Sequence, residues 1–359
     1  KPVHLFMAST PLHILLSTAI ASRLGNQIAA HLFIIDQKSI AEHPYKSILE
    51  DWPQNPFHSI RLFQGGAKGK EKLRLRKLIF NELKSWTSQH APDFIYVGND
   101  RRIEFQFAMH AASELKHVCG CYLDEGTYTY VGRKASSGFS DRFVDSTVKK
   151  LAYGRWWKHP PTIGGSAWIT TCFVAFPHLV HPLLTGKNLE EIDQSYFNNE
   201  KMRSFSQAVT NFFQLDEKRL KELFCLITLP HESVMDKIPG YRTNILSLIR
   251  SLDQTADGLI GIKYHPRNSS PDIFNLDQFS SCWIVPDGAA YETFLPLLPE
   301  STVVIGDMSS TLLSTKWLRP DLTAIAIENR QSPLFADFEP LFQKLNIRIS
   351  PNDQLGSCL

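Results

Sequence analysis

The chain has 359 residues, of which 43% are hydrophobic and 21% are charged, and its formal net charge is +2. This length suffices for two domains of ordinary size, and so small a net charge shows no global bias that would demand nucleic acid as a partner. The six cysteines form no CxxC pair and no metal-ligand spacing, which predicts reduced thiols and no metal site.

The first half of the chain alternates apolar runs of strand length with longer amphipathic runs. Strands are predicted at residues 3–7, 30–35, 94–97 and 117–123, and helices at residues 12–23, 71–86 and 104–115. This alternation is typical of a parallel sheet built from β-α-β units. Ser9 and Thr10 end the first strand, and Pro11 opens the next helix. Capping of that helix explains both hydroxyl groups, and contact with a ligand is the alternative.

A basic segment, residues 68–77, begins the second of these helices. A solvated helix face is the simplest interpretation. The alternatives are contact with an acidic glycan and contact with the anionic inner leaflet of a membrane.

Asp124 and Glu125 follow the strand predicted at residues 117–123, and Gly126 then permits a turn. Successive residues of a strand point to opposite sides, so only one of the two carboxylates can face a cleft. The sequence does not decide which one. A polar junction between strand and turn, without chemistry, is the alternative.

Residues 185–216 are polar, with few strand-forming residues and mixed charges, which predicts a linker with one or two helices. Beyond them the alternation resumes, with strands at residues 224–229, 258–264, 302–305 and 322–327 and a helix at residues 240–253. We therefore expect an α/β protein with two domains, one at residues 1–190 and the other at residues 221–335. Residues 191–220 are the expected linker between them, and residues 336–359 are the expected C-terminal segment.

The strand at residues 258–264 ends in a cluster of cations. Lys263, His265 and Arg267 alternate along the chain, so their side chains can point the same way, and Pro266 ends the strand. In open α/β sheets, ligands bind at the carboxyl ends of the strands. Three cationic or protonatable groups there suit a phosphate, and a solvated charge cluster is the alternative.

Ser309, Ser310 and Thr311 stand between the strand at residues 302–305 and a helical segment at residues 312–318. Hydroxyl groups and unpaired backbone N–H groups at a helix N-terminus both donate hydrogen bonds to an anion, and the helix dipole adds to them. Plain capping is the alternative, but it needs one such residue rather than three.

Asp287, between the cations and the hydroxyl groups, precedes an amphipathic segment. A carboxylate near a phosphate site can hold the vicinal hydroxyls of a ribose, and a favourable charge in the first helical turn is the alternative. Cations, carboxylate and hydroxyl groups, in this order within one α/β domain, predict a nucleotide pocket.

Four short motifs resemble those of bacterial sialyltransferases with the GT-B fold, in that family's order. The acidic-Gly, His-Pro, aromatic-Glu and Ser-Ser/Thr motifs of the family are matched here, in that order, by residues 122–127, 263–267, 291–295 and 309–310. The similarity is nearest to the lipooligosaccharide sialyltransferase, polysialyltransferase and Pasteurella-type groups.

The resemblance implies a GT-B fold, with two facing Rossmann-like domains that each hold a parallel sheet. It implies inverting transfer of sialic acid from CMP-N-acetylneuraminate to a sugar hydroxyl of a lipooligosaccharide or capsule glycan. No metal or other cofactor is expected. The resemblance also implies that residues 336–359 pack back across the domain junction and that a homodimer is one of the states to test. Without a secretory signal or a membrane-spanning apolar run, we expect a cytoplasmic protein, and the alternatives of a free protein and of one peripheral on the inner membrane both stay open.

The same resemblance implies roles in the nucleotide-binding half. His265 bonds the CMP phosphate and helps the leaving group to depart. Ser309 and Ser310 hold phosphate oxygens, Glu292 holds the ribose hydroxyls, and Lys263 contacts the nucleotide.

The acidic motif supplies the general base by this resemblance. We take Asp124 as the base and Glu125 as its support, and the reverse assignment stays open. Glu232, in the loop after the strand at residues 224–229, is a competing base, because in the lipooligosaccharide group the base is thought to come from the second domain. Ser9 and Thr10 are candidates for contact with the acceptor.

Three other functions are compatible with this pocket. One is transfer from another CMP-nonulosonate, carrying pseudaminic acid, legionaminic acid or Kdo. Another is the chemistry of a UDP-sugar epimerase or transferase of the same fold. The third is binding of a nucleotide or glycan without catalysis.

Overall fold

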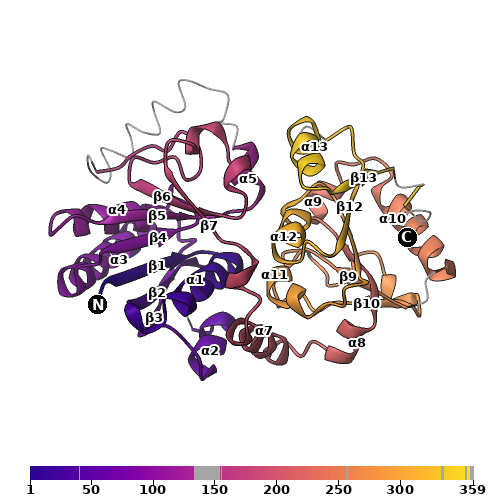
Figure 1. Ribbon diagram of the computed structural model, residues 1–359, viewed down its shortest axis with the longest axis horizontal. Coiled ribbons are helices and arrows are strands. Elements are labelled where there is room, and N and C mark those ends of the chain that lie inside the picture. Colours follow the sequence, from indigo (N-terminus) through magenta and orange to yellow (C-terminus); the bar gives the residue numbers. More distant parts are fainter. Residues whose placement is uncertain are drawn as a thin grey trace. The chain divides into compact units, whose positions relative to one another are not determined.

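The computed structural model describes residues 1–39, 41–132, 154, 156–255, 258–332, 335–351 and 354–355. The chain divides into two compact units, Lys1–Ile192 and Asp193–Leu359. Each unit is an α/β structure around a parallel sheet, and Figure 1 shows helices beside both sheets.

The sheet of the first unit has seven strands in the order β3-β2-β1-β4-β5-β6-β7. Leu5, Phe6 and Met7 of β1 are fully buried. A parallel strand that helices cover on both faces is apolar along its whole length, which explains the continuous apolar runs in the sequence. The strands are β1 (Val3–Ala8), β2 (Ala29–Gln37), β3 (Ser59–Gln64), β4 (Phe94–Val97), β5 (Cys119–Leu123), β6 (Ile169–Val174) and β7 (Asn188–Glu191). The helices are α1 (Pro11–Leu24), α2 (Pro44–Asp51), α3 (Gly69–His90), α4 (Ile103–Ser113) and α5 (Thr127–Val131), with short 3-10 turns η1 (Gly25–Gln27), η2 (Pro177–Leu179) and η3 (Pro182–Leu184).

The sheet of the second unit has six strands in the order β10-β9-β8-β11-β12-β13. These strands are β8 (Leu223–Thr228), β9 (Leu259–Lys263), β10 (Cys282–Ile284), β11 (Val303–Gly306), β12 (Thr323–Ile327) and β13 (Arg348–Ser350). The helices are α7 (Glu200–Phe212), α8 (Glu217–Lys221), α9 (Glu232–Met235), α10 (Tyr241–Thr255), α11 (Tyr291–Phe294), α12 (Ser310–Leu318) and α13 (Phe335–Lys344), with turns η4 (Gln194–Tyr196), η5 (Leu276–Gln278) and η6 (Leu295–Leu297).

The structure divides the chain differently from the sequence prediction in two places. Residues 191–220 do not form a linker outside both domains, because α7 lies in the second unit and packs against α11 and η6. The predicted boundary at residue 335 does not end the second domain either. After it, β13 pairs with β12 and completes the sheet of that unit.

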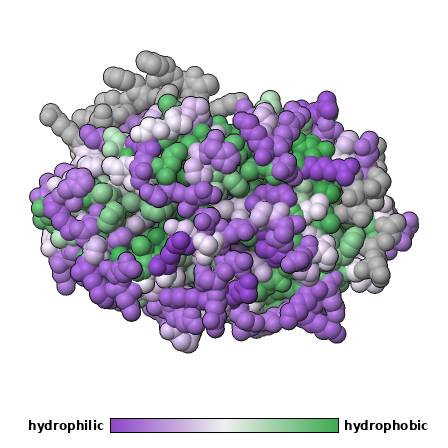
Figure 2. Space-filling model, in the orientation of Figure 1, coloured by the Kyte–Doolittle hydropathy of each residue, from purple (hydrophilic) through white to green (hydrophobic). Residues whose placement is uncertain are grey.

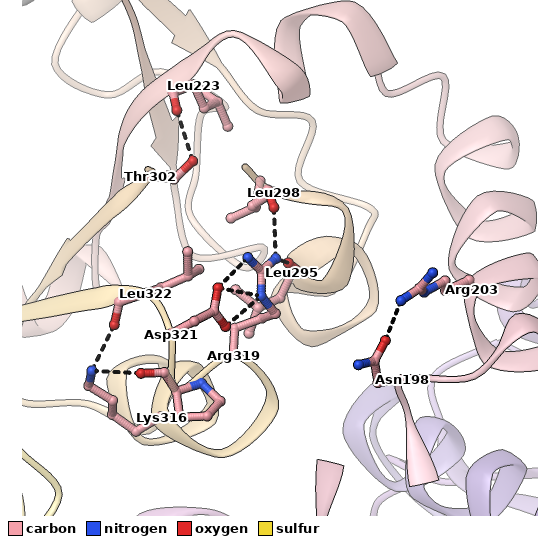
Figure 3. A network of polar contacts seen from close by, with 11 residues as sticks. Asn198, Arg203, Leu223, Leu295, Leu298, Thr302, Lys316, Arg319, Asp321 and Leu322 are labelled. Atoms are coloured by element: carbon pink, nitrogen blue, oxygen red, sulfur yellow. Dashed lines mark hydrogen bonds and ion pairs between the residues drawn. The ribbon is translucent and has the colours of Figure 1, made fainter. Parts of the chain in front are cut away.

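Charged side chains form hydrogen bonds and an ion pair around the carboxyl end of α12 (Figure 3). Arg319 donates to the carbonyl oxygen of Leu298 at 2.7 Å and pairs with Asp321 at 2.6 Å. Lys316 donates to the carbonyl oxygen of Leu322 at 2.7 Å. These bonds satisfy carbonyl oxygens of the neighbouring loops and tie those loops to the end of α12.

Among the described residues, no helix is both long enough and apolar enough to cross a bilayer. On the face drawn in Figure 2, hydrophobic residues form separate groups between hydrophilic ones.

Candidate functional site

Three neighbouring strands of the second unit place Lys263, Thr228 and Gly306 in one row. Thr228 of β8 is in register with Lys263 of β9 on one side and with Gly306 of β11 on the other. Adjacent strands lie about 4.8 Å apart, so the last residues of β9 and β11 are about 10 Å apart. The His-Pro segment (residues 263–267) and the Ser-Ser segment (residues 309–310) therefore both lie at the carboxyl ends of these strands.

A chain of hydroxyl groups crosses from β8 to the start of α12. Thr228 Oγ1 lies 3.0 Å from Thr311 Oγ1, which in turn lies 2.8 Å from Ser309 Oγ. Ser309 occupies the N-cap position, yet its side chain accepts no capping hydrogen bond from the first turn. Plain capping therefore does not explain this hydroxyl group. A Cβ at Gly306 would lie 2.4 Å from Thr228 Oγ1, so the close approach requires glycine.

Lys263 ends β9 as a buried cation. Its ammonium group donates to the carbonyl oxygen of Pro286 at 2.6 Å. Burial lowers the pKa of Lys263 to about 8, and the carboxylates of Asp287 and Glu292 oppose that shift. The predicted cation and both predicted carboxylates therefore interact electrostatically at one place.

Glu292, in α11, is held by α12. Ser314 Oγ donates to Glu292 Oε1 at 3.0 Å. Burial raises the pKa of Glu292, while this hydrogen bond and the charge of Lys263 oppose the rise. A second bond between the same helices joins the hydroxyl groups of Tyr291 and Thr315 at 2.6 Å. The carboxylate is thus fixed relative to the helix that carries Ser309.

His265 follows β9 and has a defined tautomer when neutral. The Arg267 N–H donates to His265 Nδ1 at 3.2 Å, so the proton of the neutral ring is on Nε2. Burial lowers the pKa of His265 to about 4, with further lowering by Arg267, His231 and Lys263. The neutral imidazole is therefore a hydrogen-bond donor through Nε2 near neutral pH. Pro266 and the side chain of Arg267 are exposed.

The loop between β8 and α9 holds the segment that follows His265. His231 Nε2 donates to the carbonyl oxygen of Arg267 at 3.2 Å, and the His231 ring meets that of His265 edge-on at 5.3 Å between centroids. Glu232 Oε2 accepts from Ser269 Oγ at 2.6 Å.

These bonds change the interpretation of Glu232. The hydrogen bonds from Ser269 lower the pKa of the Glu232 carboxyl, which makes it a weaker base. Its contacts are those of a residue that positions the loop after β9, and its role as the competing base stays a prediction.

A hollow of about 720 Å³ lies beside this loop, within the second unit. Its lining includes Glu232, Arg242, Ser269 and Asp272, together with apolar side chains such as Phe274. A mixed polar and apolar wall of this kind suits a ligand that carries both rings and polar groups.

In the first unit, Asp124 is fully buried, and four groups donate to its carboxylate. The backbone N–H groups of Gly126 and Ala175 lie at 2.8 and 2.9 Å, the Thr129 hydroxyl lies at 2.9 Å, and the Tyr130 hydroxyl is the fourth donor. Both oxygens are engaged, which argues against Asp124 as the base. Its contacts are those of a structural residue.

Glu125 is the less buried member of the pair, although its Oε2 atom is inaccessible to solvent. Its side chain is half-buried, whereas that of Asp124 is inaccessible. Its backbone N–H donates to Thr129 Oγ1 at 3.1 Å, which ties it to the same turn. The reverse assignment, with Glu125 as base and Asp124 as support, stays a prediction.

Ser9 and Thr10 lie at the carboxyl end of β1, as predicted. Thr10 Oγ1 accepts from the His13 N–H at 3.3 Å and so caps α1, which supports the capping interpretation for this residue. Contact of either residue with an acceptor stays a prediction.

Four residues of this site were not singled out by sequence: Thr228, Gly306, Ser314 and Ser269. No local motif marks them, since only strand register and helix packing bring them to the site. Among the described residues, no group of three or more His, Cys, Asp and Glu side chains is arranged to hold a metal ion.

No family model matches the chain, and no curated protein matches it in sequence. Several solved structures share its fold. The α/β-galactoside α-2,3-sialyltransferase of Photobacterium phosphoreum aligns over 99% of this chain and 100% of its own, with a TM-score of 0.62 and 13% identity. The GT-B domain of the Photobacterium damselae sialyltransferase aligns over 98% and 99%, with a TM-score of 0.59 and 11% identity. The UDP-GlcNAc 2-epimerase of Methanocaldococcus jannaschii aligns over 99% and 90%, with a TM-score of 0.60 and 14% identity.

At such low identity the comparisons establish the fold and nothing further. The chain has the GT-B fold, with two Rossmann-like α/β units whose sheets are parallel. The predicted fold class is confirmed.

Proposed function

We propose that this chain is a metal-independent, inverting glycosyltransferase that moves sialic acid from CMP-N-acetylneuraminate to a sugar hydroxyl. The observation that carries the proposal is the row of Lys263, Thr228 and Gly306. It sets the His-Pro segment, the Ser-Ser segment and a buried cation at one edge of the second sheet. The four sequence motifs and the sialyltransferases among the structural neighbours agree with this choice.

The leaving group in this proposal is the CMP phosphate. As the bond between the anomeric carbon and the phosphate oxygen breaks, its electron pair goes to the phosphate. The Nε2–H of His265 donates to that growing charge, and the hydroxyl groups of Ser309 and Ser310 donate beside it. The N-terminus of α12 adds its dipole. Glu292 accepts from the ribose hydroxyls, and the ammonium group of Lys263 offsets the charge of the nucleotide.

The acceptor hydroxyl attacks the anomeric carbon from the side opposite the phosphate, which inverts the configuration. Its proton passes to the carboxylate of Glu125, which acts as general base. Asp124 keeps Glu125 in place, because it fixes the turn at Gly126 and Thr129. Ser9 and Thr10 remain candidates for contact with the acceptor.

The test is transfer from CMP-N-acetylneuraminate to a panel of galactosides and sialosides, followed by mass spectrometry. We expect one acceptor class to gain a single sialyl residue, with inverted configuration at the anomeric carbon. Parallel reactions with CMP-Kdo and with CMP-activated pseudaminic and legionaminic acids decide which nonulosonate is used. Hydrolysis of the donor without any acceptor product would count against the proposal.

A second candidate, chemistry on a UDP-sugar, is favoured by the epimerase neighbour, whose TM-score is close to those of the sialyltransferases. Thermal unfolding in the presence of CMP or UDP separates the two, since a ligand raises the Tm only when it binds the folded state. We expect CMP to raise the Tm and UDP to have little effect. The opposite result would favour the epimerase-type function.

A further inference from the structure

The start of α3 concentrates positive charge. Residues 68–77 hold six cations and one anion, a net +5, whereas the whole chain carries +2, which leaves the remainder at −3. This is a local basic surface on a chain that is otherwise slightly acidic. The cations at residues 68, 70, 72, 74 and 77 are all exposed.

The same helix exposes two large apolar side chains. Leu73 is 59% exposed and Leu78 is 57% exposed, the two largest values among the exposed apolar side chains of the described residues. With 3.6 residues per turn, Lys70, Leu73, Arg74, Lys77 and Leu78 follow one another at spacings of three and four and form one face. We call this face the α3 basic-apolar face.

The fold does not require these leucines. The side of α3 that faces the unit is buried at Ile79, Leu83 and Trp86, and it begins only after the first ten residues of the helix. Phe80 stacks on Phe107 of α4 at 4.2 Å between ring centroids. The leucines of the basic-apolar face are outside this packing.

We propose that the α3 basic-apolar face docks on an anionic lipid membrane. Cations attract the headgroups, and the two leucines enter the boundary between headgroups and acyl chains. Charge complementarity alone would also suit an acidic glycan in water. The exposed leucines favour the membrane, because a soluble polyanion has no apolar region to cover them. Docking of this kind would hold the enzyme at the surface where lipid-linked or membrane-bound acceptors occur.

The experiment is co-sedimentation of the intact protein with vesicles of phosphatidylcholine and phosphatidylglycerol, and with vesicles of phosphatidylcholine alone. Neither donor nor acceptor is present, so the result does not depend on the proposed activity. We expect binding to the anionic vesicles that weakens as salt is raised. The double variant Leu73→Gln/Leu78→Gln should bind about tenfold more weakly. The triple variant Lys70→Gln/Arg74→Gln/Lys77→Gln should bind about 100-fold more weakly.

Matched controls are available elsewhere on the surface. Leu183 is 53% exposed and lies in the first unit, and Lys218 and Lys221 are exposed in α8. Leu183→Gln and Lys218→Gln/Lys221→Gln should bind like the unaltered protein.

Retention on a heparin column separates the membrane from a soluble polyanion. The leucine variant should elute at the same salt concentration as the unaltered protein. Two results would overturn the proposal: no binding of the unaltered protein to anionic vesicles, or binding that the leucine variant leaves unchanged. In the second case the face is a site for an acidic polymer.

Discussion

The polar side chains at the two ends of α12 are used in opposite ways. At the carboxyl end, Lys316 and Arg319 donate to carbonyl oxygens and Arg319 also pairs with Asp321, so the polar groups there satisfy one another. At the amino end, the Ser309 hydroxyl contacts that of Thr311 and leaves the N–H groups of the first turn without a side-chain cap. The first arrangement stabilises the fold, and the second retains the capacity to bind an anion.

Asp124 and Glu125 differ in the same way in the first unit. Asp124 is buried and accepts from four donors, whereas Glu125 is half-buried at the strand end. A polar group whose hydrogen-bond partners are all supplied by the protein contributes to stability. A polar group that the protein covers only in part is the better candidate for chemistry.

The largest expected effect is on turnover in Glu125→Gln. A general base contributes about 10²- to 10⁴-fold to a rate, so kcat should fall by about 10³-fold with little change in Tm. Asp124→Asn should act differently, because its new amide N–H₂ group would face donors such as the Gly126 N–H. We expect a loss of about 3 kcal/mol of unfolding free energy, measured by urea denaturation.

Comparison of the two variants decides the assignment. If Asp124→Asn keeps its Tm and loses turnover while Glu125→Gln keeps both, the roles are those first suggested by sequence. Glu125→Asp is a useful third variant, because it keeps the carboxylate and moves it by one methylene group.

His265→Ala should lower kcat by about 10²-fold, because the donor to the leaving phosphate is lost. Glu232→Gln should lower kcat by no more than about tenfold, since Glu232 acts on the His-Pro loop through Ser269. Initial rates at saturating donor give both values. An effect of Glu232→Gln as large as that of Glu125→Gln would restore Glu232 as the base.

A direct comparison of the ends of α12 uses Ser309→Ala/Ser310→Ala and Arg319→Met. The first variant removes donors to the phosphate, and we expect CMP affinity to fall by about tenfold with a small change in Tm. The second leaves Asp321 and the Leu298 carbonyl without their partner, and because Asp321 is partly exposed we expect a loss of about 1.5 kcal/mol of unfolding free energy with unchanged kcat per folded molecule. Calorimetric titration with CMP and urea denaturation measure the two effects. Equal loss of stability in both variants would show that Ser309 and Ser310 are structural.

The central strands could be predicted from sequence, because burial on both faces makes them apolar throughout. Four of the five strands that were not predicted are sheet edges: β3, β7, β10 and β13. An edge strand has one neighbour and more solvent, so its sequence need not be apolar, as in the exposed Asn188–Glu191 of β7.

The residues of the candidate site also fall into two groups, those that the sequence predicts and those that it does not. Lys263, His265, Glu292 and Ser309 could be found because each belongs to a short local motif. Thr228 and Gly306 could not, since their importance depends on strand register, which adjacent residues do not encode. The choice between Asp124 and Glu125 also needed the structure, because it depends on which side of β5 the rest of the unit covers.

The smallest expected effect is a pH dependence of CMP binding that involves Lys263. This buried side chain combines the two kinds of polar group compared above, because the protein supplies one hydrogen-bond acceptor and further donors remain. One of its three donors goes to the Pro286 carbonyl oxygen, and an ammonium group can donate twice more. Its pKa is lowered to about 8, so the charged form predominates below that pH and is lost as the pH rises through it. One pH unit above the pKa, about a tenth of the molecules keep the charge. Affinity for CMP should therefore weaken by up to about tenfold between pH 7 and pH 9, whereas in Lys263→Met it should be weaker at pH 7 and nearly constant over this range. Equal pH dependence in both proteins would mean that the ammonium group of Lys263 serves only to hold the end of β9 against Pro286.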